Sequence, residues 1–188
     1  MMDWDALEKM CMTCTACGLC ATRHHVVFGV GPRDADVMFV GEGPGEQEDL
    51  QGEPFVGPAG HLLDDMLSII DLSREICYIA NIVKCRPPMN RDPLPAESEA
   101  CMPWLREQFA LLRPKIVVCL GRVAAQQLID PGFSVTKYHG RFIEKQGTLF
   151  MATLHPAALL RNPRNKPLAF EDFVALRDKI HEVCDHTY

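Results

Sequence analysis

The chain has 188 residues, 47% of them apolar, which is enough for one substantial core and short for two independent domains. We therefore expect a single domain over residues 1–188. The formal net charge of −6 argues against binding nucleic acid along a broad basic face, because phosphate neutralisation supplies most non-specific affinity. With neither a basic-then-apolar leader nor an apolar run of the ~18 residues that a membrane span needs, we expect a cytoplasmic protein without membrane contact. Nothing in the sequence demands more than a monomer.

Four apolar, β-branched runs are each followed directly by a loop, which is typical of buried strands. They are DVMFVGEGPG (36–45), ICYIANIVKC (76–85), KIVVCLGR (115–122) and TLFMATLHP (148–156). Amphipathic stretches separate or follow them, at 59–71, Glu97–Leu112, Arg122–Leu128 and Phe170–Val183. This alternation predicts an α/β fold with three α/β/α layers and a central, mostly parallel four-stranded sheet.

Three of the loops that follow the predicted strands contain unusual sequences: GEGPG, NIVKCRPP and LHPAALLRNP. Ligands bind at the carboxyl ends of the strands in such sheets, so the three loops should meet at one edge. Proline and glycine concentrate in 43–60 and 86–95, which we interpret as long functional loops.

The nine cysteines favour metal ligation over disulfides, because a chain without a secretory leader stays where thiols are reduced. One candidate ligand set is the run CxxCxxCxxC formed by Cys11, Cys14, Cys17 and Cys20. It resembles a bacterial ferredoxin run but has two residues, not three, in its last gap. The other set is Cys14, Cys17, Cys85 and Cys101. Either set could hold a 4Fe-4S cluster or tetrahedral zinc.

Four segments in this order, GEGPGEQED, PFVGPAG, NIVKCRPPMNR and HPAALLRNP, resemble the family 4 uracil-DNA glycosylases of the uracil-DNA glycosylase superfamily. The resemblance spans roughly Cys14 to the final helix. It implies one 4Fe-4S cluster held by Cys14, Cys17, Cys85 and Cys101, and thereby favours iron over zinc. Cys11 and Cys20 remain as additional cysteines.

The resemblance also implies an activity on uracil-containing DNA, single- or double-stranded. A monofunctional glycosylase would flip the uracil out, hydrolyse its N-glycosidic bond and release free uracil, leaving an abasic site that initiates base excision repair. A relative in the superfamily that is trapped covalently carries a reactive histidine in an inserted segment. No such histidine lies between Asn81 and Cys101, so we expect turnover.

Four residues match family positions that contact the base. Phe55 would stack on uracil, Asn81 would read its Watson-Crick edge, and Glu48 would lie beside carbon 5 and exclude the methyl group of thymine. The backbone of Gly43 would approach the base closely. Without the resemblance, Phe55 could be a core residue, Asn81 a capping residue and Glu48 a solvated charge.

Three residues are candidates for the chemistry. His155 matches the donor to the 2-carbonyl oxygen of the departing uracil. Glu42 matches an acid that orients water or stabilises the cationic sugar, although an acid after a strand can simply cap a helix. Asn90 is a lesser candidate for holding the water.

The segment after His155 resembles an element that enters the minor groove and fills the gap left by the flipped base. Its candidate DNA-contacting residues are Leu159, Leu160, Arg161 and Arg164. Leu159 and Leu160 could instead begin a buried helix. Two other classes compete with the glycosylase: an electron-transfer protein using CxxCxxCxxC, and a non-catalytic DNA-binding protein.

Overall fold

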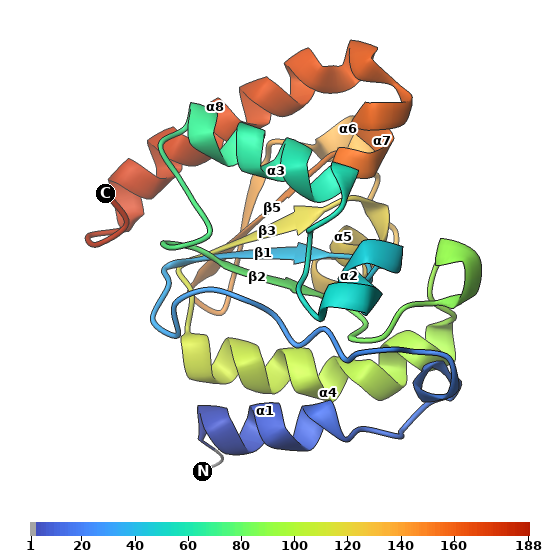
Figure 1. Ribbon diagram of the computed structural model, residues 1–188. Helices are drawn as coiled ribbons and strands as arrows, with labels where there is room; N and C mark the ends of the chain where they lie inside the picture. The colour runs from blue at the N-terminus through green and yellow to red at the C-terminus, as the bar shows by residue number, and fades with distance from the viewer. Residues whose placement is uncertain (1–2) are drawn as a thin grey trace.

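The computed structural model describes residues 3–188 and has a central sheet of five strands in the order β2-β1-β3-β5-β4. The strands are β1 Val37–Gly41, β2 Tyr78–Asn81, β3 Ile116–Leu120, β4 Phe142–Lys145 and β5 Thr148–Thr153. The four predicted strands are all present and parallel to one another (Figure 1). The α/β class is confirmed, but the predicted count of four strands is one too low.

The additional strand, β4, pairs antiparallel with β5 at the edge of the sheet. Gln146 and Gly147 connect the two strands with φ angles of 50° and 83°. Positive φ at both central residues is the geometry of a two-residue type I′ hairpin. Because β4 is short and partly exposed, its sequence FIEK lacks the apolar run by which the other strands were predicted.

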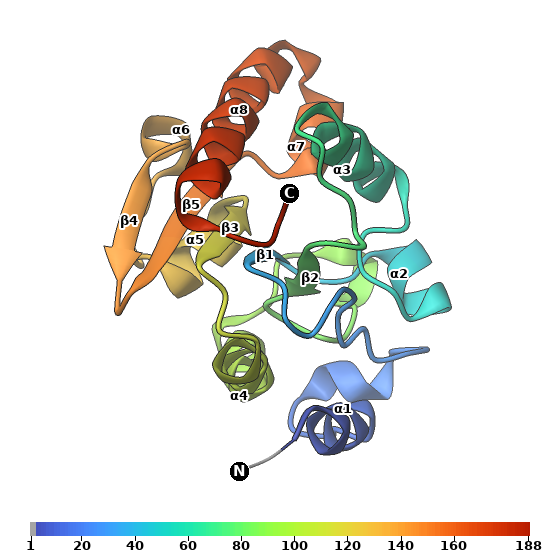
Figure 2. The ribbon, with the colours of Figure 1, turned by 90° about the vertical axis from the view of Figure 1, so that its left-hand side faces the viewer.

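Helices cover both faces of the sheet and give the predicted three layers (Figures 1 and 2). One face packs against α1 Trp4–Met12, α4 Pro95–Leu112 and α5 Arg122–Leu128. The other packs against α3 Pro58–Ile69, α7 Pro156–Arg161 and α8 Lys166–Val183. Alternation along β1 explains the division, since Met38 and Val40 join the first core and Val37 and Phe39 the second.

The four predicted helices are confirmed with small changes at their ends, but α1, α2 (Glu46–Gln51), α6 (Val135–Tyr138) and α7 were not among them. Helices α4 and α8 begin earlier than predicted, each with a proline in its first turn, where proline is tolerated. Helix α1 was not predicted, and α2 Glu46–Gln51 interrupts the segment 43–60 that was interpreted as a loop. Glu48 reaches back to the Gly45 amide at the start of α2, which stabilises this short helix.

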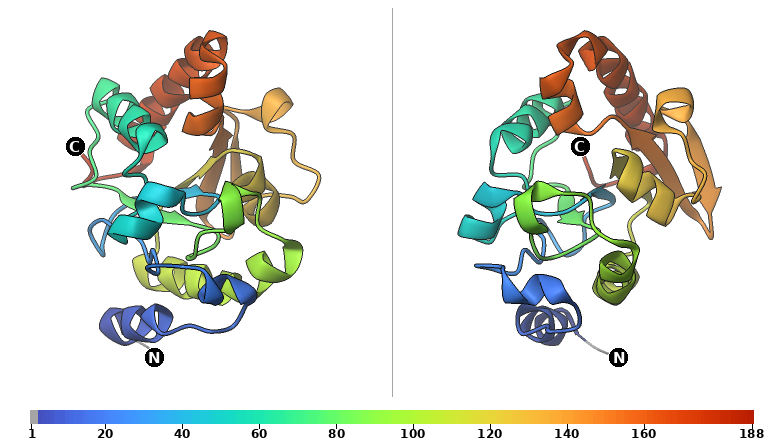
Figure 3. Two further views of the ribbon diagram at one scale, coloured as in Figure 1. Left: turned by 45° about the vertical axis from the view of Figure 1, so that its right-hand side comes forward. Right: turned by 90° about the vertical axis from the view of Figure 1, so that its right-hand side faces the viewer.

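The remaining elements are short. They are the 3-10 turns at Gly18–Ala21, Pro88–Asn90 and Pro163–Asn165, and helix α6 Val135–Tyr138. Within residues 3–188, no helix has the length and apolarity to cross a membrane. Figure 3 shows α2, the segment around Pro88–Asn90 and α7 gathered around the carboxyl ends of the parallel strands. The three predicted loops therefore meet at one edge of the sheet.

Candidate active site

A cavity of about 740 Å³ opens at the carboxyl ends of the parallel strands. Of the residues proposed from sequence, those that line it are Glu42, Gly43, Glu48, Phe55, Asn81, Asn90, His155 and Arg161. These residues come from four segments of the chain, 42–48, 55, 81–90 and 155–161, which therefore meet in one pocket. Leu159, Leu160 and Arg164 do not line it.

Asn81 forms the floor of this pocket at the last position of β2. Its side chain is buried, and its Oδ1 atom has no hydrogen-bond partner among residues 3–188. A buried polar atom without a partner is rare in folded proteins and calls for an explanation. Gly41 allows this arrangement, because a Cβ atom there would lie 2.5 Å from both Asn81 Oδ1 and Phe55 Cζ.

Phe55 and His155 form one wall of the pocket. Their rings are stacked, with centroids 5.8 Å apart and an interplanar angle of 29°. Phe55 is buried and has a φ of 55°, which is unusual for a residue with a bulky side chain. The two aromatic candidates from distant segments therefore share one surface.

His155 is held as a neutral imidazole with a defined tautomer. It is the N-cap of α7, and its Nδ1 accepts a hydrogen bond from the Ala157 amide at 3.1 Å. The proton of the neutral ring must then be on Nε2. Burial, with a smaller effect of the Arg161 charge, lowers the pKa of His155 to about 4. At neutral pH the ring can donate from Nε2 without carrying a charge.

Glu42 follows β1 and lies beside a second carboxyl group, Asp92. Burial and this neighbour raise the pKa of Glu42 to about 7, and the protonated Glu42 can donate a hydrogen bond to Asp92. Asp92 also forms an ion pair with Arg122. Sequence reasoning assigned no role to Asp92 or Arg122. Arg122 directly follows Gly121 after β3. Because ligands bind at the carboxyl ends of parallel strands, this position could have been proposed from the sequence.

The Glu48 carboxylate binds backbone amides of two loops. It accepts hydrogen bonds from Gly45 at 3.1 Å, Val56 at 2.9 Å and Gly57 at 2.8 Å. Glu48 is thus no solvated charge. It joins the start of α2 to the loop that carries Phe55, a structural role that the sequence did not reveal.

Asn90 lies at the rim of the pocket in a left-handed backbone conformation, with a φ of 55°. Its Oδ1 accepts a hydrogen bond from Arg86 Nε at 2.7 Å. The side-chain amide is therefore oriented by Arg86, which leaves its NH₂ group to bind water or substrate.

The two leucines of α7 have different surroundings. Leu159 is 1% exposed and belongs to the core between α7 and the sheet, so the prediction that it contacts DNA is wrong. Leu160 is 43% exposed, and Arg161 and Arg164 are also exposed. Successive residues on a short helix point in different directions, which separates Leu159 from the surface that Leu160 occupies.

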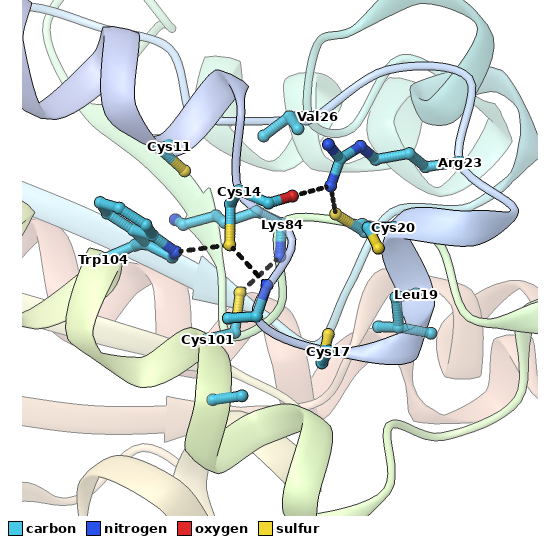
Figure 4. A pocket seen from close by; sticks show the side chains of 13 residues that line it. Cys11, Cys14, Cys17, Leu19, Cys20, Arg23, Val26, Lys84, Cys101 and Trp104 are labelled. Carbon is cyan, nitrogen blue, oxygen red and sulfur yellow. Dashed lines mark hydrogen bonds between the residues drawn. The ribbon is translucent and has the colours of Figure 1, made fainter.

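Six cysteines line a second cavity between α1, the turn at Gly18–Ala21 and α4, and Figure 4 shows several of them pointing toward one another. They are Cys11, Cys14, Cys17, Cys20, Cys85 and Cys101. All nine cysteines of the chain are free thiols. Across residues 3–188, no three His, Cys, Asp or Glu side chains lie close enough together to bind a single metal ion between them.

Three of these sulfur atoms accept hydrogen bonds from N–H groups. Trp104 Nε1 donates to Cys14 at 3.3 Å, the Lys84 amide to Cys101 at 3.2 Å and Arg23 Nη1 to Cys85 at 3.4 Å. Such donors stabilise thiolates. These donors act against burial, which raises the pKa of Cys85 and Cys101, so they would matter most for thiolates bound to a metal.

The sequence of the chain is similar to proteins of known family. The model of the uracil DNA glycosylase superfamily matches residues 28–176. A type-4 uracil-DNA glycosylase of Archaeoglobus fulgidus is 44% identical over 98% of this chain and 94% of its own length. The protein of the same name from Thermotoga maritima is 46% identical over 86% of this chain and 85% of its own length. A third type-4 uracil-DNA glycosylase, from Sulfurisphaera tokodaii, is 42% identical over 93% of this chain and 84% of its own length.

The fold, the pocket and the family match together define a member of the uracil DNA glycosylase superfamily. Within that superfamily, the chain belongs to the type-4 uracil-DNA glycosylases.

Proposed function

We propose that this chain is a monofunctional uracil-DNA glycosylase that excises uracil from DNA as the first step of base excision repair. The observation that supports this most strongly is the unpartnered, buried Oδ1 atom of Asn81 at the floor of the pocket. The uracil ring presents an N–H between two carbonyl oxygens. An N–H aimed at Oδ1 would satisfy the acceptor, and the amide NH₂ could then donate to the 4-carbonyl.

Cytosine would not fit this arrangement. Its ring nitrogen 3 is an acceptor where uracil has an N–H, and its carbon 4 carries an amino group where uracil has a carbonyl oxygen. A site with a buried polar group rejects a ligand that leaves the group unpaired. Phe55 would supply the stacking surface for the flipped base, and the Gly43 backbone would border it. Glu48, held by three amides, would form a fixed wall beside carbon 5 and exclude the methyl group of thymine.

Cleavage of the N-glycosidic bond leaves positive charge on the sugar and negative charge on the uracil. A neutral His155 donating from Nε2 would stabilise the charge on the 2-carbonyl oxygen as the bond breaks. Glu42, as a carboxylate, would orient the water that attacks the sugar or stabilise the cation, and Asn90 would help to hold this water. The uracil departs as an anion, water adds to the sugar carbon and loses one proton, and the uracil anion takes up one proton, so that charge balances.

On the DNA side, Leu160 would fill the space left by the flipped nucleotide, and Arg161 and Arg164 would bind phosphates. All three are exposed at the end of α7 or just beyond it, next to His155. This small basic surface would allow DNA binding despite the net charge of −6. That the protein is a monomer and cytoplasmic stays a prediction from sequence.

A 4Fe-4S cluster would be held by Cys14, Cys17, Cys85 and Cys101. The fit rests on their shared cavity, their free thiols and the N–H donors to Cys14, Cys85 and Cys101. When bound, such a cluster would supply a covalent link between the N-terminal segment, the loop after β2 and α4. Burial raises the pKa of Cys101 to about 11, so its thiolate would form only when a metal replaces the proton.

The test of this function is release of free uracil from a labelled oligonucleotide that contains one uracil, without added metal. Matched oligonucleotides with cytosine or thymine at the same position serve as controls. We expect uracil alone to be released, leaving an abasic site. A folded, iron-loaded sample that releases no uracil would contradict the proposal.

A further inference from the structure

We propose that Arg74 is a positioning residue that holds Phe55 in its base-stacking orientation. This inference rests on the proposed function, since it assigns a task in binding the flipped base. Arg74 lies in the connection between α3 and β2, and it does not line the pocket. Neither the sequence motifs nor the residues around the cavity point to it.

The Arg74 guanidinium binds the backbone of the Phe55 loop. Nη1 donates to the Pro54 carbonyl at 2.7 Å, and Nη2 donates to the Phe55 carbonyl. The Nη2 atom also lies 3.5 Å from the Gly60 carbonyl, at the start of α3. The remaining donor, Nε, binds Asp64 Oδ1 at 2.6 Å, which fixes the plane of the guanidinium. The planar, forked arrangement of these donors is specific to arginine.

The backbone at Phe55 needs such support. Its φ of 55° is left-handed, and a bulky residue keeps this conformation only where its surroundings enforce it. Gly60 is part of the same arrangement, because a Cβ atom at position 60 would lie 1.8 Å from the Phe55 carbonyl oxygen. The loop therefore packs against the first turn of α3 with no room for a side chain.

Glu48 binds the same loop through other backbone groups. Its carboxylate accepts from the amides of Val56 and Gly57, while Arg74 donates to the carbonyls of Pro54 and Phe55. Backbone groups of four successive residues, 54–57, are thus fixed by two side chains from different elements. The Phe55 ring is left stacked on His155 and facing the pocket. Rigid support of this kind allows a ring to stack on a base without first being ordered.

The experiment measures uracil release for the wild type, Arg74→Gln, Phe55→Ala and the double variant. For Arg74→Gln we expect kcat/KM to fall by about ten- to a hundredfold, because small displacements of positioning groups have effects of this size. Inhibition by free uracil should weaken in the same variant. Arg177→Gln, at a half-buried position of α8 that does not line the pocket, is the matched control and should behave as the wild type.

The double variant separates positioning from a general structural effect. If Arg74 acts through Phe55, Arg74→Gln should cost less than about threefold once Phe55 is alanine, because coupled residues are non-additive. The same fold loss in both backgrounds would overturn the proposal. Should Arg74→Gln fail to fold, as judged by circular dichroism, Arg74→Lys replaces it in the single and double variants. Lysine keeps the positive charge but lacks the planar guanidinium that binds several carbonyls at once.

Different results would contradict the glycosylase function and the role of Arg74. A wild-type protein that releases no uracil contradicts the glycosylase function. A wild-type protein that releases uracil, together with additive losses in the double variant, contradicts only the role of Arg74.

Discussion

His155 shows how the position of one residue sets its chemistry. The ring is the N-cap of α7, so the Ala157 amide takes its Nδ1 lone pair and leaves the proton on Nε2. The backbone just after β3 packs closely against this residue, and Gly121 permits the approach, since a Cβ atom there would lie 2.8 Å from His155 Cβ. A neutral donor of fixed direction results from local backbone geometry and burial acting together.

We predict that His155→Ala keeps its affinity for uracil-containing DNA but loses about a hundred- to a thousandfold in turnover. A preorganised donor is worth roughly 3 to 4 kcal/mol in such reactions. Binding is measured with an uncleavable uracil analogue in the oligonucleotide, and turnover by uracil release. His61→Ala, at an exposed position of α3, serves as the control. Near-normal turnover in His155→Ala would remove this residue from the mechanism.

The pH dependence of uracil release should reflect Glu42 rather than His155. With its pKa raised to about 7, Glu42 is protonated below that pH and a carboxylate above it. If the carboxylate is the active form, kcat should rise with pH through about 7, and Glu42→Gln should lose this rise. The pKa of His155 is about 4, so its protonation adds no step between pH 5 and 9. A wild-type profile that is flat from pH 5 to 9 would contradict the role of Glu42.

At the scale of elements, the six residues of α7, Pro156–Arg161, connect the core to the surface that we propose faces DNA. Its first residue is proline, which suits the first turn, and His155 caps it. The helix then buries Leu159 and exposes Leu160 and Arg161. The same turn of helix thus holds the His155 ring in place and presents the groups proposed to contact DNA.

We predict opposite effects for the two neighbouring leucines of this helix. Leu159→Ala should lower the free energy of unfolding by about 2 to 5 kcal/mol, because it leaves a cavity in the core. Leu160→Ala should change stability by less than about 0.5 kcal/mol, as exposed substitutions do, and should weaken uracil-DNA binding. Chemical denaturation and DNA-binding titrations measure the two effects. Equal losses of stability in both variants would contradict this division of roles.

Across the whole molecule, the second cavity brings together segments that are far apart in the chain. The N-terminal segment contributes Cys14 and Cys17, the loop after β2 contributes Cys85, and α4 contributes Cys101. This cavity lies on the face of the sheet that packs against α1 and α4, whereas the active-site pocket lies at the carboxyl ends of the strands. A cluster here would stabilise the end of β2 that carries Asn81, since Cys85 lies four residues after Asn81.

We predict that Cys85→Ala loses the brown chromophore and most of the bound iron, and unfolds at a lower temperature. Metal binding contributes to folding where the ligands come from distant segments. Iron analysis, the visible spectrum and thermal denaturation measure these changes. Cys184→Ala, at the end of α8, should keep its iron. Unchanged iron content in Cys85→Ala would remove this residue from the ligand set.

Several features could be predicted from the sequence because each depends on residues close together in the chain. The four parallel strands appear as apolar runs, and α3 and α5 appear as amphipathic stretches. Since parallel strands end at one edge, the meeting of the loops that carry Glu42, Asn81 and His155 also followed from the pattern. The sequence QG between β4 and β5 could have indicated the hairpin, but β4 has no apolar run of its own.

By itself, the sequence determined the family, the α/β class and eight of the residues that line the pocket, because motifs and periodicity are local properties of the chain. Only the tertiary structure decided the protonation of Glu42 and His155, the burial of Leu159 and the backbone contacts of Glu48 and Arg74. The reason is physical: a pKa, a buried surface or a hydrogen bond depends on which distant groups the fold brings within a few ångströms, and residue spacing carries no record of that.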